Sequence, residues 1–247
     1  MSEVVLYESA DGVCTITINR PDKLNAIDAG VEIALAAAWR RFAASDDRVA
    51  ILTGAGERAF SVGKDLKSDS KPDYRRFVPG YDIEVRKPIV AAVSGWCIGG
   101  AMTLVQAADL CVATRSARFM YPEAKLGFAG GLIAGLAGRI PHKVAMEIML
   151  LGEELSAERA YQVGFVNKLV DEGEHLAAAQ VYARRLADNA PLVLEMLKSF
   201  AGQVTPAGPM ERASHALREV ERVMESDDFR EGFASQQEKR KPAFKRR

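Results

Sequence analysis

The chain has 247 residues, of which 48% are hydrophobic, and its 33 Lys and Arg residues balance its 33 Asp and Glu residues. This size and composition suit one large α/β domain, or one domain with a helical appendage. The balanced charge argues against nucleic acid or an anionic membrane as a partner, and no apolar stretch has the character of a transmembrane helix.

Strands and helices are expected to alternate in the first half of the chain. Residues 4–7 and 13–19 are rich in β-branched side chains, and Asp11-Gly12 between them predicts an antiparallel hairpin. Asp28 is a suitable N-cap for a helix whose apolar positions follow helical spacing up to Phe42. Further strands are predicted at residues 49–53, 89–93, 110–113 and 117–121.

The later part of the chain is expected to be mainly helical. Polar residues 67–81 contain Pro72, Pro79 and Gly80, which predicts a loop or short helix that could act as a lid. We therefore predict an α/β core over residues 1–190 and a helical C-terminal region over residues 191–247. The predicted helices after Pro141 cover residues 142–151, 156–163, 174–189, 191–203 and 209–225.

Two glycine-rich segments follow predicted strands and indicate a site for negative charge. They are residues 60–66, after the 49–53 strand, and residues 95–100, after the 89–93 strand. Glycine after a strand lets backbone N–H groups approach a ligand closely, and two such loops can aim two N–H groups at one oxygen. Gly100 also opens a predicted helix, so its N–H is a donor at the positive helix end. This pattern predicts an oxyanion hole for a carbonyl that gains charge.

Glu123 is the predicted proton carrier beside that carbonyl. It follows Pro122 at the entrance to a loop, a common place for catalytic groups, although a solvated surface glutamate is the alternative interpretation. Asp65 is better interpreted as a cap for the following N–H groups than as a base. Lys64 in the same loop is a candidate partner for a phosphate group.

Cysteines and histidines indicate no covalent or metal framework. The three cysteines (Cys14, Cys97 and Cys111) have no C-x-x-C spacing, which predicts reduced thiols in a reducing compartment. The three histidines are far apart in the sequence, so we expect no metal site and no histidine-based triad. The first residues lack the charged and apolar regions of a secretory signal, and we expect a cytoplasmic protein.

The motifs resemble, in their order and spacing, those of the enoyl-CoA hydratase/isomerase family, also called the crotonase family. The resemblance covers nearly the whole chain. It rests on Asn19-Arg20-Pro21, Asn25-Ala26, residues 60–66, Lys87-Pro88, residues 95–100, Ala108-Asp109, Ala117-Arg118-Phe119, Pro122-Glu123, Leu126-Gly127, Gly164-Phe165-Val166-Asn167 and Glu238-Lys239-Arg240-Lys241. It implies a spiral of repeated ββα units and C-terminal helices that assemble a homotrimer or a dimer of trimers.

The resemblance also implies an acyl-CoA thioester as substrate, with coenzyme A as part of the substrate and no separate cofactor. By carry-over, Glu123 exchanges a proton with the acyl chain, and the backbone N–H groups of Val62 and Gly100 form the oxyanion hole. The implied substrate-binding residues are Lys64, Asp65, Gly99, Thr103, Gly131 and Lys239.

Three positions depart from the family pattern. Thr103 stands where two-glutamate hydratases carry their second glutamate, and a hydroxyl cannot replace a carboxylate as the base for water. Glu123 alone could shuttle a proton between two carbons and move a double bond. Gly131 aligns with a glycine that holds the reacting water, but its surroundings are more apolar. Lys239 matches a lysine near the adenine of coenzyme A, but Gln236 replaces the aromatic residue before it.

Three functions stay open from the sequence. The first is a hydratase/isomerase-type enzyme that uses one-glutamate isomerisation or atypical hydration. The second is another enolate reaction on the same scaffold, either decarboxylation or C–C cleavage. The third is a non-catalytic member that binds coenzyme A, or RNA through the last nine residues, six of which are Lys or Arg. Glu123, both glycine segments and the zero net charge argue against the third function and against a nucleic-acid partner.

Overall fold

The computed structural model describes residues 3–68, 73–127 and 131–247 of the chain. The strands within them are β1 (Val5–Ala10), β2 (Val13–Ile18), β3 (Val49–Gly54), β4 (Ala59–Ser61), β5 (Ile89–Val93), β6 (Trp96–Ile98), β7 (Leu110–Thr114), β8 (Arg118–Met120), β9 (Glu154–Ser156) and β10 (Lys168–Val170). They form a six-stranded sheet in the order β1-β2-β3-β5-β7-β10 and a four-stranded sheet in the order β4-β6-β8-β9. The β1–β2 and β8–β9 pairs are antiparallel, and the other neighbouring strands are parallel.

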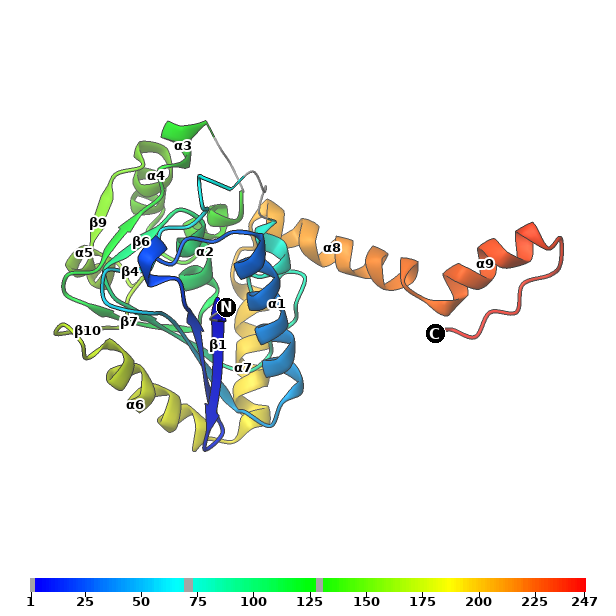
Figure 1. Ribbon diagram of the computed structural model, residues 1–247, viewed down its shortest axis with the longest axis horizontal. Coiled ribbons are helices and arrows are strands. Elements are labelled where there is room, and N and C mark those ends of the chain that lie inside the picture. Colours follow the sequence, from blue (N-terminus) through cyan, green and yellow to red (C-terminus); the bar gives the residue numbers. More distant parts are fainter. Residues whose placement is uncertain (1–2, 69–72, 128–130) are drawn as a thin grey trace.

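Helices connect the strands and cover both sheets (Figure 1). The α-helices of the described residues are α1 (Ala29–Ala44), α2 (Gly100–Ala107), α3 (Glu123–Leu126), α4 (His142–Leu151), α5 (Ala157–Gln162), α6 (His175–Ala187), α7 (Pro191–Val204), α8 (Pro209–Met224) and α9 (Asp227–Gln237). Short 3-10 helices are η1 (Pro21–Lys23), η2 (Tyr74–Arg76) and η3 (Leu132–Gly138).

The larger sheet is buried on both faces. Along β3, Val49 and Ile51 belong to the cluster that packs under α6, whereas Ala50 and Leu52 belong to the main core beneath α1. This division follows from the alternation of side chains along a strand. Every residue of β3 is buried, as expected for a parallel strand that is covered on both sides.

The predicted elements of the first half are confirmed. Asp11 and Gly12 form the hairpin turn with positive φ angles of 51° and 75°. The Asp28 carboxylate caps α1 by accepting a hydrogen bond from the Val31 N–H at 3.0 Å. Gly100 opens α2, as the glycine pair predicted.

The helices predicted after Pro141 are confirmed, but some helices and short strands of the chain were not predicted. The five helices predicted after Pro141 match α4 to α8 to within two residues at each end. The sequence analysis missed α9 and the strands β4, β6, β9 and β10. Each of these strands has only three residues, which is too short for an alternating pattern to stand out.

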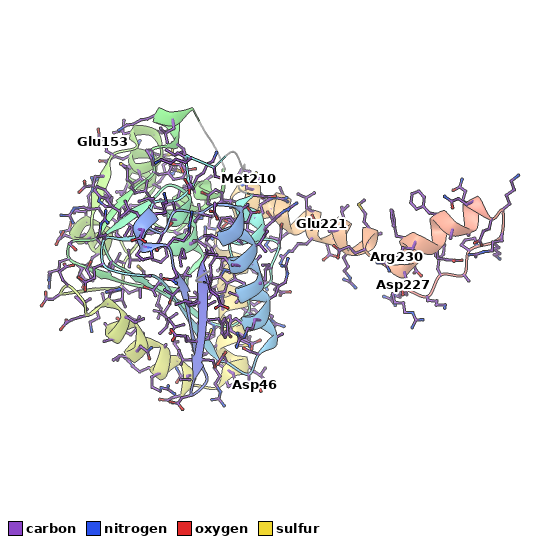
Figure 2. The ribbon with its side chains drawn as sticks, in the orientation of Figure 1. Asp46, Glu153, Met210, Glu221, Asp227 and Arg230 are labelled. Carbon is purple, nitrogen blue, oxygen red and sulfur yellow. The ribbon has the colours of Figure 1, made fainter. Side chains whose placement is uncertain are left out.

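Helices α8 and α9 form an arm that extends away from the body (Figure 1). Helix α7 lies against the body, where Lys198 Nζ donates to the Lys87 carbonyl at 2.9 Å and pairs with Asp109 at 2.7 Å. The division of the chain after residue 190 therefore stays a prediction. Met210 lies where the arm leaves the body, and Asp227 and Arg230 lie on its far helix (Figure 2).

The arm and α7 expose many apolar side chains. No helix in the described part of the chain is long and apolar enough to cross a membrane. The exposed apolar residues of these three helices are Leu192, Val193, Met196, Leu197, Phe200, Val204, Leu217, Val220, Val223, Met224, Phe229 and Phe233.

Candidate active site

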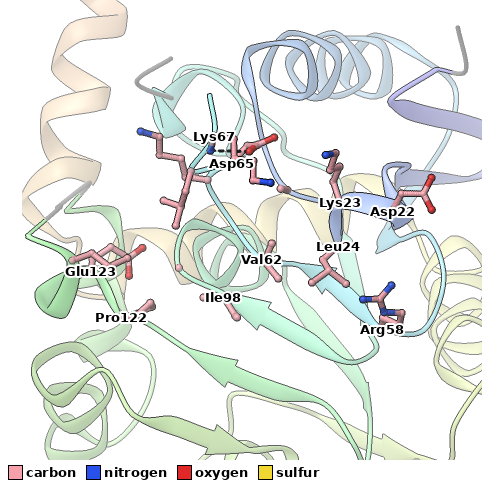
Figure 3. A pocket seen from close by; sticks show the side chains of 15 residues that line it. Asp22, Lys23, Leu24, Arg58, Val62, Asp65, Lys67, Ile98, Pro122 and Glu123 are labelled. Atoms are coloured by element: carbon pink, nitrogen blue, oxygen red, sulfur yellow. Dashed lines mark hydrogen bonds between the residues drawn. The ribbon is translucent and has the colours of Figure 1, made fainter. Parts of the chain in front are cut away.

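A cavity of about 740 Å³ opens at one end of the smaller sheet (Figure 3). Strands β4, β6 and β8 are parallel neighbours there, so the segments that follow them meet at the same sheet edge. Residues 62 and 64–67 follow β4. Ile98 is the last residue of β6 and Gly99 comes next, whereas Pro122 and Glu123 lie just after β8. The described lining residues are Asp22, Lys23, Leu24, Ala26, Arg58, Val62, Lys64, Asp65, Leu66, Lys67, Ile98, Gly99, Pro122, Glu123 and Leu126.

Glu123 places a carboxylate in this cavity with little access to water. The residue is 6% exposed, and its Oε2 atom has no hydrogen-bond partner among the described residues. Burial raises the pKa of the Glu123 carboxyl from its ordinary 4.5 to about 7. A carboxyl with such a pKa is suited to accept and return a proton near neutral pH.

Glycines let the catalytic segments approach one another. Gly99 has a φ of 61°, and a Cβ atom there would lie 2.7 Å from Glu123 Oε1. A Cβ atom on Gly63 would lie 2.5 Å from the Ile98 carbonyl oxygen and 3.2 Å from the Gly100 nitrogen. The two glycine segments therefore lie in contact, and larger residues at Gly63 or Gly99 would separate them or displace the carboxylate.

The structure contradicts Val62 as an oxyanion donor. The Val62 N–H donates to the carbonyl of Leu24 at 3.1 Å, so it is engaged within the fold. Ile27 pairs with the same loop: its N–H donates to the Gly63 carbonyl at 2.7 Å, and its carbonyl accepts from the Asp65 N–H at 2.9 Å. The motif could not reveal this pairing, because residues 24–27 lie more than 30 positions earlier in the chain.

Lys64 carries the N–H that points away from this pairing. Lys64 forms a parallel bridge with Ile27, in which Ile27 bonds to the Gly63 carbonyl and the Asp65 N–H, the groups on either side of Lys64. The N–H of Lys64 itself therefore points away from Ile27. The backbone N–H of Lys64 instead donates a hydrogen bond to the Tyr74 hydroxyl. The candidate donor of this loop is therefore the Lys64 N–H, on the other side of Gly63 from Val62.

Asp65 acts as a cap, as the sequence predicted. Its carboxylate accepts a hydrogen bond from the Lys67 N–H at 3.1 Å, and Arg20 lies 3.3 Å from its other oxygen. Because both carboxylate oxygens hold the loop in place, Asp65 is not arranged to act as a base.

Three predicted substrate-binding residues lie outside the cavity lining. Thr103 is buried one turn further along α2, where its hydroxyl donates to the Gly100 carbonyl at 2.6 Å. Gly131 precedes η3, and a Cβ atom there would lie 2.9 Å from Met210 Cγ. Lys239 follows α9 at the far end of the arm. Within one chain, Lys239 is therefore not brought to the cavity.

Tyr74 occupies a position that the sequence analysis did not foresee. A Cβ atom on Gly100 would lie 1.8 Å from Tyr74 Cε1 and 2.2 Å from its hydroxyl oxygen. Burial, followed by the nearby charge of Glu123, raises the pKa of the Tyr74 hydroxyl. Tyr74 belongs to the predicted lid, but the path of that segment could not be derived from its sequence.

The histidines and cysteines contribute no visible metal centre. No group of three or more His, Cys, Asp or Glu side chains within residues 3–68, 73–127 and 131–247 is arranged to hold a metal ion. Cys14, Cys97 and Cys111 are free and buried. Burial raises the pKa of each of these thiols, which keeps them protonated.

Comparison with known proteins agrees with this architecture. The pattern of the enoyl-CoA hydratase/isomerase family matches residues 8–247. The chain is 36% identical to carnitinyl-CoA dehydratase of Salmonella typhi over 100% of both proteins, and 34% identical to (E)-benzylidenesuccinyl-CoA hydratase of Thauera aromatica over 98% of both. The crystal structure of a probable enoyl-CoA hydratase/isomerase from Mycobacterium abscessus matches with a TM-score of 0.77 and 40% identity over 98% of both chains. The chain therefore belongs to the enoyl-CoA hydratase/isomerase family and has the crotonase fold.

Proposed function

We propose that this protein transfers a proton on the acyl chain of a coenzyme A thioester, with Glu123 as acid and base. The observation that carries this proposal is the Glu123 carboxylate, which is buried in the cavity with one oxygen unpartnered among the described residues and a pKa of about 7. Burial removes this carboxyl from water, and no hydrogen bond to its Oε2 atom from the described residues compensates for the lost hydration. Such a group has no evident role in holding the fold together.

The oxyanion hole of the proposal consists of the backbone N–H groups of Lys64 and Gly100. Removal of a proton beside a thioester carbonyl leaves an enolate, and its oxygen needs donors that are already in place. Gly100 is the first residue of α2, where the N–H groups lie at the positive end of the helix. The close approach of Gly63 to the Gly100 nitrogen supports the placement of the two donors on neighbouring loops.

Two outcomes of this chemistry are supported by different observations. Hydration or dehydration beside the thioester is supported by the relatives, which are named as a hydratase and as dehydratases. A double-bond shift is supported by Thr103, because its hydroxyl is bonded to the Gly100 carbonyl and cannot serve as a second base. In either reaction, Glu123 is the carboxylate that carries the proton.

The cationic part of the cavity supports binding of the coenzyme A phosphates. Lys23 and Arg58 lie at one end of the cavity and Lys67 near the other end, with Val62 and Ile98 between them (Figure 3). Cationic side chains interact favourably with phosphate and leave the apolar part of the cavity for the rest of the ligand.

We also propose self-association through α7 and the arm, in the form of a homotrimer or a dimer of trimers. An apolar surface of this extent on helices that extend into solvent is typical of an interface. Lys239 would then reach a cavity only in a neighbouring copy.

The free cysteines support a cytoplasmic location.

A turnover screen tests the proposed function. The protein is incubated with α,β- or β,γ-unsaturated, β-hydroxyacyl and carboxyacyl CoA thioesters, and the products are analysed by chromatography and mass spectrometry. A gain or loss of one water identifies hydration or dehydration, and a changed retention time at constant mass identifies isomerisation. Loss of CO₂, or no turnover of any thioester, would contradict the proposal.

A further inference from the structure

Tyr74 fills the space that a side chain on Gly100 would take. Its ring carbon Cε1 and hydroxyl oxygen lie 1.8 Å and 2.2 Å from the position that a Cβ atom on Gly100 would take. The same hydroxyl accepts a hydrogen bond from the Lys64 N–H. The Tyr74 hydroxyl therefore binds one backbone group that the proposed function assigns to the oxyanion hole, Lys64 N–H, and lies against the residue that carries the other, Gly100.

The surroundings of Tyr74 show that this position is specific. The residue is 6% exposed, and its ring packs against that of Phe77 with centroids 4.9 Å apart. Glu123 and Tyr121 lie close enough to influence its hydroxyl electrostatically. Because Gly100 has no side chain, the phenol ring lies directly against the first turn of α2.

Polar contacts near the surface hold the short helix that carries Tyr74. Asp73 caps η2 by accepting from the Arg75 N–H at 3.2 Å, and the Asp73 N–H donates to Glu32 at 3.3 Å. Arg75 pairs with Asp73 at 2.9 Å but lies 3.8 Å from Asp82. Partly exposed ion pairs contribute little to stability, so these polar contacts of η2 add little to the free energy needed to displace Tyr74.

We propose that Tyr74 is an internal ligand of the oxyanion hole, and that the carbonyl oxygen of an acyl-CoA thioester must displace its hydroxyl. This inference rests on the proposed function, because the competing oxygen is that of the thioester. Free coenzyme A has no carbonyl at this position and does not compete with Tyr74. Only the state in which Tyr74 is displaced accepts the thioester carbonyl. The apparent affinity for the thioester is therefore the intrinsic affinity multiplied by the fraction of molecules in that state.

The hydroxyl of Tyr74 can be removed while its ring is retained. In Tyr74→Phe, the Lys64 N–H loses its internal acceptor, and we expect butyryl-CoA to bind about 2- to 10-fold more tightly, as loss of one competing hydrogen bond implies. Free coenzyme A should bind both proteins equally. Tyr7→Phe is the matched control, because it removes a hydroxyl that donates to Asp47 at 2.7 Å, remote from the cavity lining.

Fluorine NMR gives a second readout that does not depend on activity. The six tyrosines are replaced by 3-fluorotyrosine, and the resonance missing from Tyr74→Phe identifies Tyr74. Butyryl-CoA should shift or broaden this resonance, and free coenzyme A should leave it unchanged. Two results would overturn this inference and leave the proposed function intact. Either butyryl-CoA binds without affecting the Tyr74 resonance, or it binds Tyr74→Phe no more tightly than the wild type. If butyryl-CoA binds neither the wild type nor Tyr74→Ala, the proposed function fails and the inference fails with it.

Discussion

Replacement of Glu123 by Gln is expected to stabilise the folded protein at high pH while it removes the proposed acid and base. Folding takes the Glu123 carboxyl out of water and raises its pKa from 4.5 to about 7, with no hydrogen-bond partner for Oε2 among the described residues. Above pH 7, the folded protein therefore holds a buried negative charge that the unfolded chain would hydrate. Gln has nearly the same shape and no charge, so it avoids this penalty.

The size and sign of the effect follow from proton linkage. Between pH 4.5 and about 7, the folded state binds more protons at Glu123 than the unfolded state, so the wild-type free energy of unfolding falls as the pH rises through this range. At about 1.4 kcal/mol for each pH unit, the whole fall is about 3.5 kcal/mol. For a protein of this size, it corresponds to about 7 to 14 °C in melting temperature.

Thermal unfolding of both proteins from pH 4 to pH 8.5 measures this effect. The difference in melting temperature, Glu123→Gln minus wild type, should increase through pH 4.5–7 and then remain constant. The new amide in Glu123→Gln can lack hydrogen bonds, but this shifts the melting temperature equally at every pH and leaves the pH dependence unchanged. Asp65→Asn serves as a control, because the Asp65 carboxylate is hydrogen-bonded. A difference that is independent of pH would refute the assignment of a raised pKa to Glu123.

Four further predictions concern Glu123, the proposed oxyanion hole, the pairing of Val62 with Leu24, and the arm. If Glu123 acts as the base, kcat/KM should rise with pH through about 7, whereas a flat profile over pH 5.5–8.5 would contradict that role. Gly100→Pro removes one donor at the first position of α2, and it is made in Tyr74→Ala because its Cβ atom would otherwise meet the Tyr74 ring; steady-state turnover should fall about 10²- to 10³-fold or more relative to Tyr74→Ala, with circular dichroism as the check on folding. Val62→Pro should destabilise the protein by about 1–3 kcal/mol in urea unfolding, because the carbonyl of the half-buried Leu24 loses its donor, and an unchanged midpoint would contradict the pairing. A chain shortened after Thr205 should sediment as a monomer if the arm drives assembly, and an unchanged oligomer would place the interface elsewhere.

The sequence predicted those parts of the fold that depend on local signals. Asp11-Gly12, the Asp28 cap and the glycine pair before α2 each have a backbone requirement that adjacent residues reveal. The long helices after Pro141 were equally accessible, because their apolar periodicity extends over several turns. Three-residue strands such as β9 and β10 carry no such period and form only because a neighbouring strand is already in place.

The geometry of the candidate site was predicted only in part, and its chemistry stays a prediction. Glu123 and Gly99 were identified by position, and the structure brings them into contact. The donor next to Gly63 was assigned to the wrong residue, because the pairing of Val62 with Leu24 joins segments that are far apart in the sequence. The place of Tyr74 depends on the path of a lid segment whose contacts are tertiary, so no pattern within that segment could reveal it.

Exchange of the α-hydrogens of butyryl-CoA in D₂O tests the central claim most directly. This thioester has no double bond to hydrate or move, so uptake of deuterium reports only proton removal beside a stabilised carbonyl. We predict that the wild-type protein incorporates deuterium at the α-carbon at pH 8, as measured by mass spectrometry, and that Glu123→Gln does so about 10²- to 10⁴-fold more slowly. Equal exchange rates for the two proteins, or no exchange by wild-type protein that binds butyryl-CoA, would contradict the role of Glu123 as the proton carrier.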